Sequence, residues 1–185
     1  GGNLTFLRDN VIYHKDELLQ EADVPDIFKV LDQIAMRVPA GSNGVLYTPW
    51  IWGERAPVDD RHLRAGLYNI SLHNTREDII RAFLEGIAFN TRWLLQPVEK
   101  FLGRKVPSIN IVGGGAQSDV WCQIFADVMN VEIKQVSDPI YANARGAAWI
   151  GAVGLGEISF SDVPRLVEFK RNYVPQSTNR GVYDE

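Results

Sequence analysis

The stretch "NIVGGGAQSDVWCQIFADV", residues 110–128, places three consecutive glycines between a strand-like segment and a helix-like segment. Glycine loses more backbone entropy on folding than any other residue, so three glycines indicate that the main chain must be free of side chains here. A strand, a glycine turn and a helix N-terminus form an anion site, because backbone N–H groups point outward and the helix dipole favours negative charge. The stretch matches neither the dinucleotide fingerprint nor the Walker A loop. Its spacing leaves two interpretations open, a nucleotide-binding turn and a plain packing turn.

The segments around the glycines alternate between strand and helix patterns. Strands are expected at 108–112 and 131–136, and a helix of small residues at 143–156. A short helix at 163–169 and a polar tail follow. The helix after the glycines has apolar residues at i, i+3, i+4 and i+7, namely Trp121, Ile124, Phe125 and Val128. This alternation predicts an α/β layered domain.

The first half of the chain contributes helices and two early strands. Residues 1–37 are mostly helical in pattern, and Pro25 separates a second helix at 26–37. Thr75 opens the longest helix with a capping box formed with Asp78, Pro97 is expected to bend or end it, and Gly103 supplies a later stop. A loop is expected at 39–44, and strands at 45–52, where Pro49 interrupts, and at 65–71.

Composition narrows the class of protein. The chain has 185 residues, 45% of them hydrophobic, and a net charge of −4, which fits one globular domain and argues against nucleic-acid or anionic-membrane partners. No apolar run approaches the roughly 20 residues that span a bilayer. Cys122 is the only cysteine, so no internal disulfide is expected and a reducing, cytoplasmic location fits. The three histidines (His14, His62 and His73) have no metal-ligand spacing, so no metal site is predicted.

Other candidate residues have plainer interpretations. Adjacent acids such as Asp59 and Asp60 in a polar loop are usually solvated, and Glu54 with Arg55 reads as an ion pair that fixes a loop. Ser118 is better interpreted as a helix N-cap than as a nucleophile, because it has no G-x-S-x-G setting and no partnered histidine. The five tryptophans are typical of core or interface positions.

Five blocks, in order, resemble the C-terminal half of the FGGY carbohydrate kinases, most closely the xylulokinase-like members. The glycine stretch resembles the family's Gly-Gly-Gly-Ala-x-Ser signature. The others are "GGNLTFLRD" (1–9), "PWIWGERAP" (49–57), "LEGIAF" (84–89) and "ARGAAWIGAVGLG" (144–156). Within "VDDRHLRAG" (58–66), Ala65 stands where the family has Gly. The "YVPQ" segment at 173–176 is similar to the family's Tyr-x-Pro, and the last helix that follows it there is expected to be absent or short here.

The resemblance implies an actin-like ATPase fold of the ribonuclease-H-like type, with a central mixed sheet flanked by helices. It implies that the whole chain, 1–185, is a single ATP-binding C-terminal domain. The N-terminal sugar-binding domain is expected to be absent from the chain. The implied reaction is phosphoryl transfer from MgATP (ATP/ADP with Mg²⁺) to a sugar hydroxyl, with a carboxylate base. The sugar is expected to be xylulose-like, on resemblance alone.

The resemblance also assigns nucleotide-binding positions. The N–H of Gly115 corresponds to the group that binds a nucleotide phosphate, with Gly114 and Ala116 beside it in the same motif. Asp119 corresponds to the residue on the adenine side; relatives often carry Asn or Pro there, and a carboxylate accepts but cannot donate a hydrogen bond. Gly1 and Thr5 correspond to the positions that flank the ribose and base.

The catalytic aspartate, the sugar-binding residues and both phosphate-binding loops of the family's N-terminal side match nothing in 1–185. The catalytic base is therefore expected upstream of Gly1, and the isolated chain is expected to lack kinase activity. Two alternatives stay open: a non-catalytic actin-like domain for nucleotide binding or oligomerisation, and a fragment without independent function. The small-residue helix at 143–156 is expected to be exposed and to support a homodimer.

Overall fold

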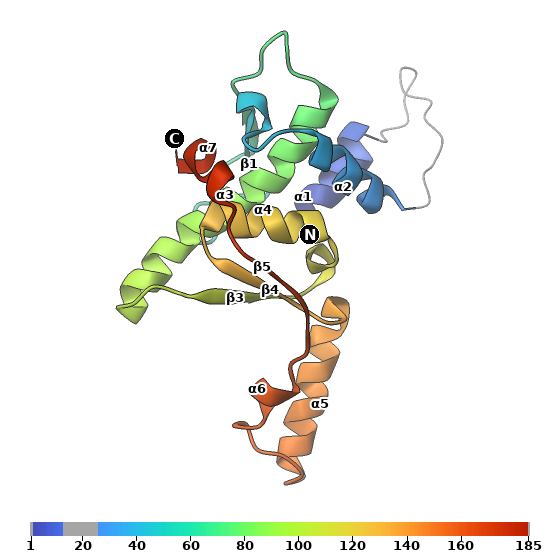
Figure 1. Cartoon of the computed structure of the whole chain (residues 1–185), viewed down its shortest axis with the longest axis vertical. Helices are drawn as coiled ribbons and strands as arrows, with labels where there is room; N and C mark the ends of the chain where they lie inside the picture. Colours follow the sequence, from blue (N-terminus) through green and yellow to red (C-terminus); the bar gives the residue numbers. More distant parts are fainter. Residues whose placement is uncertain (1, 13–25, 185) are drawn as a thin grey trace.

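A computed structural model describes residues 2–12 and 26–184 (Figure 1). At the N-terminus, helix α1 (Gly2–Leu7) continues into the π-helical turn η1 (Arg8–Ile12), and α2 spans Ile27–Arg37. Asp26 caps α2 by accepting a 3.2 Å hydrogen bond from the backbone N–H of Lys29. The predicted helix at 26–37 is confirmed. Gly1 and the stretch 13–25, which includes the break at Pro25, lie outside the described residues.

Two sheets organise the described chain. Strands β1 (Leu46–Thr48) and β2 (Gly66–Tyr68) form an antiparallel pair, shorter than the predicted strands. The larger sheet has the order β3-β4-β5, with β3 (Ser108–Ile111) parallel to β4 (Glu132–Val136). Strand β5 (Phe169–Tyr173) pairs antiparallel with β4. The sheet is therefore mixed, as expected.

Helix α4 (Asp119–Met129) is the crossover between the parallel strands β3 and β4, and it separates two apolar clusters. Toward α3 (Arg76–Leu102) it buries the predicted face through Trp121, Ile124 and Val128. Toward the sheet it buries Cys122 and Ala126. Burial raises the pKa of the Cys122 thiol to about 12, so this cysteine is a packing residue.

Helix α3 begins as predicted but does not end at Pro97. The capping box is present, with the N–H of Thr75 donating to Asp78 at 2.7 Å. Pro97 lies on the exposed side, where the carbonyl that loses its partner can reach water, and the helix continues to Leu102. Gly103 caps the end of the helix. Within its last turns, Glu99 accepts a 3.0 Å hydrogen bond from the N–H of Val106, which ties α3 to the segment that leads into β3.

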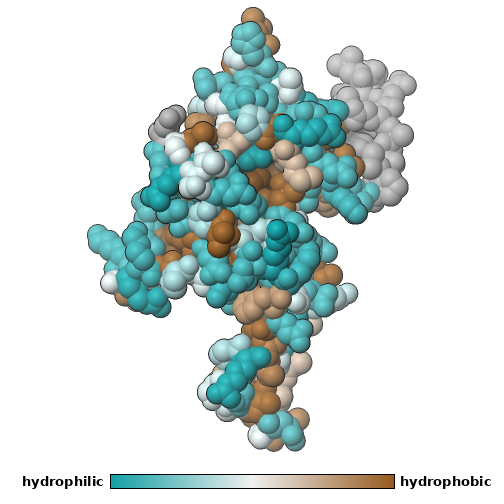
Figure 2. Space-filling model, viewed as in Figure 1, coloured by the Kyte–Doolittle hydropathy of each residue, from teal (hydrophilic) through white to brown (hydrophobic). Residues whose placement is uncertain are grey.

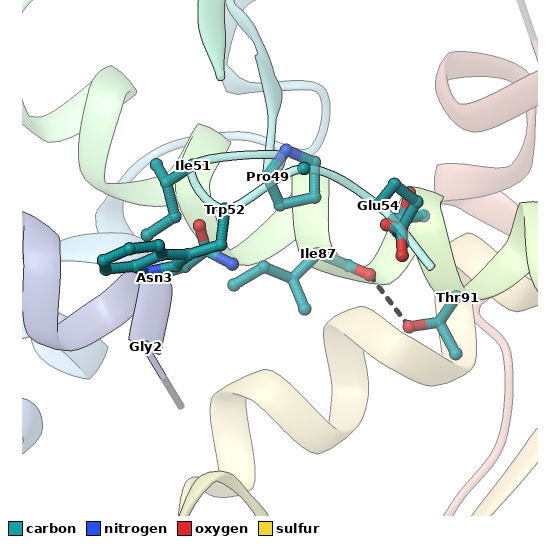
Figure 3. A pocket seen from close by; sticks show the side chains of 10 residues that line it. Gly2, Asn3, Pro49, Ile51, Trp52, Glu54, Ile87 and Thr91 are labelled. Atoms are coloured by element: carbon teal, nitrogen blue, oxygen red, sulfur yellow. Dashed lines mark hydrogen bonds between the residues drawn. The ribbon is translucent and has the colours of Figure 1, made fainter. Parts of the chain in front are cut away.

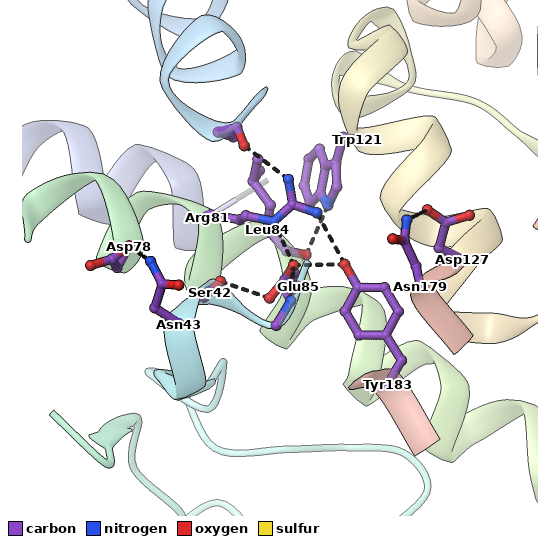
Figure 4. Close-up of polar contacts among 12 residues, drawn as sticks. Ser42, Asn43, Asp78, Arg81, Leu84, Glu85, Trp121, Asp127, Asn179 and Tyr183 are labelled. Carbon is purple, nitrogen blue, oxygen red and sulfur yellow. Dashed lines mark hydrogen bonds and ion pairs between the residues drawn. The ribbon is translucent and has the colours of Figure 1, made fainter. Parts of the chain in front are cut away.

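A buried polar cluster joins α3 to three other segments (Figure 4). The Glu85 carboxylate, only 2% exposed, accepts from Arg81 Nε at 2.6 Å and from Tyr183 Oη at 2.7 Å. It also accepts from Ser42 Oγ at 2.7 Å. Arg81 in turn donates to the Ala35 carbonyl at the end of α2 at 2.9 Å. The loop, α3 and the C-terminal tail therefore meet at one carboxylate, and Arg81 links α2 to it.

The C-terminal region departs most from expectation. The predicted helix at 163–169 is only four residues long, α6 (Val163–Leu166), and Phe169 already belongs to β5. Four of the five β5 residues are exposed and only Tyr173 is buried, so this edge strand lacks the apolar alternation that marks a half-buried strand. The last helix, α7 (Arg180–Asp184), is short, as expected.

Helix α5 (Ala142–Gly154) projects away from the body of the molecule (Figure 1) and has no buried residue. The helix predicted at 143–156 is therefore confirmed, with slightly different bounds. Figure 2 shows apolar surface running along this projecting part. The exposed fractions of Ile150 and Leu155 are 64% and 81%. The predicted exposed face is therefore present.

Candidate nucleotide-binding site

The three glycines of the turn have three different roles. Gly113 adopts φ 89°, ψ −176°, a region essentially restricted to glycine, and its N–H donates to the Pro139 carbonyl at 2.8 Å. A Cβ on Gly115 would lie 2.5 Å from the indole ring of Trp121, so Gly115 is required by packing. A Cβ on Gly114 would meet no atom within 4 Å. Packing therefore accounts for Gly115, whereas Gly114 leaves its backbone open and the nucleotide-binding interpretation of the turn stays a prediction.

The turn leads into α4 through a helix cap. Residues 114–117 form the 3₁₀ turn η3 (Gly114–Gln117), and Ser118 accepts a hydrogen bond from the Trp121 N–H at 2.9 Å. The predicted N-cap role of Ser118 is confirmed. Ser118 Oγ also donates to Asp32 on α2 at 2.7 Å. The Ala116 carbonyl accepts from Gln135 of β4 at 2.7 Å, so the turn is fixed on both sides.

A cavity of about 720 Å³ opens beside the turn. Its volume lies within the range typical of small-molecule sites. Its lining includes residues of α2 and its N-cap, from Asp26 to Met36, together with Gly114, Gly115 and the start of α4. Leu4 of α1 and Lys170 of β5 also line it. The cavity therefore joins backbone N–H groups, apolar side chains and charged groups of both signs.

Lys170 and Asp119 form an ion pair at one side of this cavity. Lys170 Nζ donates to Asp119 Oδ1 at 2.8 Å, and the Gln135 side chain donates to the same oxygen at 3.0 Å. These bonds, that from Lys170 above all, lower the pKa of Asp119. Asp119 is therefore ionised at neutral pH and accepts hydrogen bonds. Lys170 had no sequence signal because it lies in β5, the strand that the pattern missed.

Asp32 is the second carboxylate of the cavity, and its environment differs. Burial raises the pKa of Asp32, and the nearby charge of Asp119 adds to the shift, although the Ser118 hydroxyl opposes it. A charged carboxylate at this place therefore works against folding. Such shifted groups in clefts are typical of functional sites, but structural networks also produce them.

The predicted site residues divide into three groups. Gly114, Gly115 and Asp119 line the cavity together. Ala116 is buried behind the turn, and Thr5 lies on α1 next to the lining residue Leu4. Gly1 lies outside the described residues. No sequence motif indicated the α2 wall or Lys170, because their positions depend on tertiary packing.

A smaller cavity of about 300 Å³ lies between α3 and the loop that contains Pro49 and Glu54 (Figure 3). Glu54 accepts from the N–H of Arg55 at 2.7 Å and from Asn90 Nδ2 at 2.7 Å. The predicted ion pair between Glu54 and Arg55 is wrong, because the carboxylate binds the Arg55 backbone instead of its guanidinium. The loop-fixing role remains. Nearby, Asp60 accepts from the His62 N–H at 2.7 Å, whereas Asp59 is exposed.

The described residues contain neither a metal-binding cluster nor a membrane-spanning helix. No three His, Cys, Asp or Glu side chains within 2–12 and 26–184 gather as a metal site. In the same residues, no helix combines the length and the apolar character needed to cross a membrane.

The mixed sheet with its helices makes this an α/β domain with a cavity at its glycine turn, and solved sugar kinases of the actin-like ATPase fold share it. The model of the FGGY family of carbohydrate kinases, C-terminal domain, matches residues 1–155. The chain belongs to this family. Members of the family are phosphotransferases, and the matched region is their C-terminal domain.

Similar proteins agree with this assignment. A xylulose kinase of Staphylococcus epidermidis is 32% identical over 160 residues, which cover 85% of this chain and 32% of that protein. A gluconokinase of Bacillus licheniformis is 29% identical, covering 97% of this chain and 35% of that protein. The structure of Plasmodium falciparum glycerol kinase with ADP has a TM-score of 0.76 at 20% identity, covering 98% of this chain and 34% of that one, and shows the shared fold. The chain spans about a third of the length of these relatives.

Alanine substitutions of Gly115 and Gly114 distinguish a glycine required by packing from one whose backbone is open. Gly115→Ala is expected to lower the free energy of unfolding by about 1–3 kcal/mol, because its Cβ would overlap the Trp121 ring. Gly114→Ala, the matched control, is expected to stay within about 0.5 kcal/mol of the wild type, because its Cβ meets open space. Urea unfolding measures both. Equal losses in the two variants would contradict the assignment.

Asp32→Asn is expected to raise the free energy of unfolding at pH 7. The folded-state pKa of Asp32 lies above its unfolded value, so the charged carboxylate destabilises the fold at neutral pH, and the penalty disappears as the pH falls through the folded-state pKa and the group is protonated. The gain should therefore shrink as the pH falls through that region, which urea unfolding at several pH values measures.

Asp162→Asn is the matched control for this change. The Ser159 hydroxyl lowers the pKa of Asp162, so its ionised form favours folding and the substitution has the opposite sign at pH 7. A loss of stability in Asp32→Asn at neutral pH would show that the Ser118 contact outweighs the cost of burial.

Proposed function

We propose that this domain binds the nucleotide of MgATP in the 720 Å³ cavity, as the ATP-binding part of a sugar kinase. The observation that carries the proposal is Gly114, whose backbone meets no neighbour where a side chain would stand and which lines the cavity. The first N–H groups of the η3 turn have no acceptor within the turn, so a phosphate can accept from them. The Plasmodium falciparum relative, whose structure was solved with ADP, supports the same ligand.

Each predicted residue has a role in this proposal. The N–H groups of Gly114 and Gly115 bind phosphate oxygens, and Ala116 supports the turn from behind through its bond to Gln135. The Asp119 carboxylate accepts from the amino group of adenine. For Thr5 we propose a place beside the ribose and base, and the resemblance assigns the same role to Gly1. Mg²⁺ would neutralise phosphate charge and would be held by the nucleotide and by groups from the N-terminal half of the enzyme, since the described residues offer no carboxylate cluster for it.

In the complete enzyme, the reaction is transfer of the γ-phosphoryl group of ATP to a hydroxyl of a sugar. The transfer needs a carboxylate base and an acceptor site, which we place on the N-terminal sugar-binding domain outside 1–185. A pentulose similar to xylulose is the proposed acceptor, because the relatives include a xylulose kinase, although a gluconokinase is also among them. A cytoplasmic location, expected from the single cysteine, stays a prediction.

A MgADP titration of this chain, followed by backbone amide NMR, tests the proposal. Shifts are expected at Gly114, Gly115 and Asp119, with weak affinity because the remaining phosphate contacts belong to the other half of the enzyme. Gly114→Ala should weaken binding, since its methyl group would occupy the phosphate position, whereas Gly146→Ala on α5, which also meets no neighbour, should not.

Two results would contradict the proposal. Absence of shifts at millimolar MgADP would assign the glycines to packing and would favour the alternative of a non-catalytic oligomerisation domain. Sugar-dependent ADP production by this chain alone, measured in a coupled assay, would show that the catalytic base lies within 1–185.

We also propose that the exposed face of α5 pairs with a second copy in solution. Its residues follow helical spacing and carry no charge: Ala144, Ala147, Ala148, Gly151 and Leu155. A helix of 13 residues with internal glycines is marginally stable alone, and small residues let a facing helix approach closely. A self-complementary face of this kind suits a two-fold dimer.

Sedimentation at increasing protein concentration measures this association. A dimer is expected, and Ala148→Glu should shift it to monomer because the charge would be buried without a partner. Thr178→Glu, at an exposed position in the C-terminal tail, is the control and should leave the dimer unchanged. A wild-type chain that stays monomeric at high concentration would contradict the dimer.

A further inference from the structure

Helix α2 forms a wall of the cavity that none of the five sequence blocks includes. Phe28, Asp32 and Met36 are spaced at i, i+4 and i+8, so they lie along one side of the helix, and all three line the cavity. The Asp32–Ser118 hydrogen bond fixes this side of α2 against the glycine turn. Any molecule held at the turn therefore also faces α2.

Phe28 is the exposed aromatic ring of the cavity. The other aromatic residue among those that line the cavity is Trp121. Its indole N–H donates to the Leu84 carbonyl at 3.0 Å and its ring packs against Gly115, so both are already occupied by contacts within the protein. Trp121 is 6% exposed, whereas Phe28 is 42% exposed. A large apolar side chain on a cavity wall with this much free surface is available to a ligand.

Arg8 holds the Phe28 ring from outside the cavity. Its guanidinium carbon lies 5.4 Å from the ring centroid, within the range of a cation–π contact, and Arg8 itself pairs with Asp9. Phe28 lines the cavity and Arg8 does not, so the cation lies over the ring without being one of the cavity's lining residues. The ring is thus oriented before a ligand arrives, which lowers the entropy cost of binding.

We infer that Phe28 is the residue on which the nucleobase stacks, so that α2 is the base-recognition wall of the site. This inference rests on the proposed nucleotide function. Every nucleobase has a flat π-face that an aromatic side chain can stack on. Asp26 and Asp32 line the same cavity as Asp119, so their carboxylates can join that of Asp119 in accepting hydrogen bonds from the base. The phosphates lie at Gly114 and Gly115, which line the same cavity.

Calorimetric titrations of the full 185-residue chain with MgADP and with magnesium pyrophosphate test this assignment. Phe28→Ala is expected to weaken MgADP about 5- to 100-fold, the range for loss of one base–aromatic stack, and to leave pyrophosphate binding unchanged. Phe28→Trp should retain MgADP binding, and Phe28→Leu should lose most of what Phe28→Ala loses. Phe101→Ala, which truncates a 90% exposed ring at the end of α3, is the matched control.

The possible results separate the base platform from the nucleotide site itself. Wild-type binding of MgADP with no change in Phe28→Ala or Phe28→Leu would overturn the stacking role and leave the nucleotide site standing. Equal weakening of MgADP and pyrophosphate would show that Phe28 supports the fold, and would also overturn it. Absence of MgADP binding by the wild-type chain would overturn the proposed function and, with it, the role of Phe28.

Discussion

The buried carboxylate of Glu85 is the constraint on which the rest of this structure depends. It accepts hydrogen bonds from α3, from the loop before β1 and from the C-terminal tail, through Arg81, Ser42 and Tyr183. Loss of one partner from such a cluster leaves an uncompensated charge in the core, which is strongly destabilising. Elements separated by as many as 98 residues in the chain are therefore held in one arrangement around α3.

The position of the glycine turn follows from that arrangement. The carbonyl of Leu84, the residue before Glu85, accepts the indole N–H of Trp121 and so fixes α4 against α3. The Trp121 ring then fills the space where a side chain at Gly115 would stand. Gly86 serves the same helix on its other side, because a Cβ there would lie 2.2 Å from the Tyr47 carbonyl of β1. Packing around α3 thus determines where the open backbone of Gly114 faces.

The parts of the fold that could be predicted from sequence are those with local signals. The capping box at Thr75, the N-cap at Ser118 and the apolar face of α4 each depend on residues within one or two turns of each other. Strand β5 and the α2 wall could not be predicted in this way. Four of the five β5 residues are exposed, and Asp32 gains its role only from Ser118, 86 residues later in the chain.

The candidate site also combines residues that the sequence identifies with residues that only the structure reveals. Sequence motifs identify the turn, because only glycine leaves the main chain without a side chain and a run of glycines is visible in the sequence itself. They do not identify its charged neighbours, since Lys170 reaches Asp119 across 51 residues and Asp32 is held near the turn despite the cost of burying its charge. Packing alone would be served better by an uncharged residue at position 32. Because Asp32 also lines the cavity, its carboxylate stands where a ligand held at the turn would meet it, and this position is what connects α2 to the candidate site.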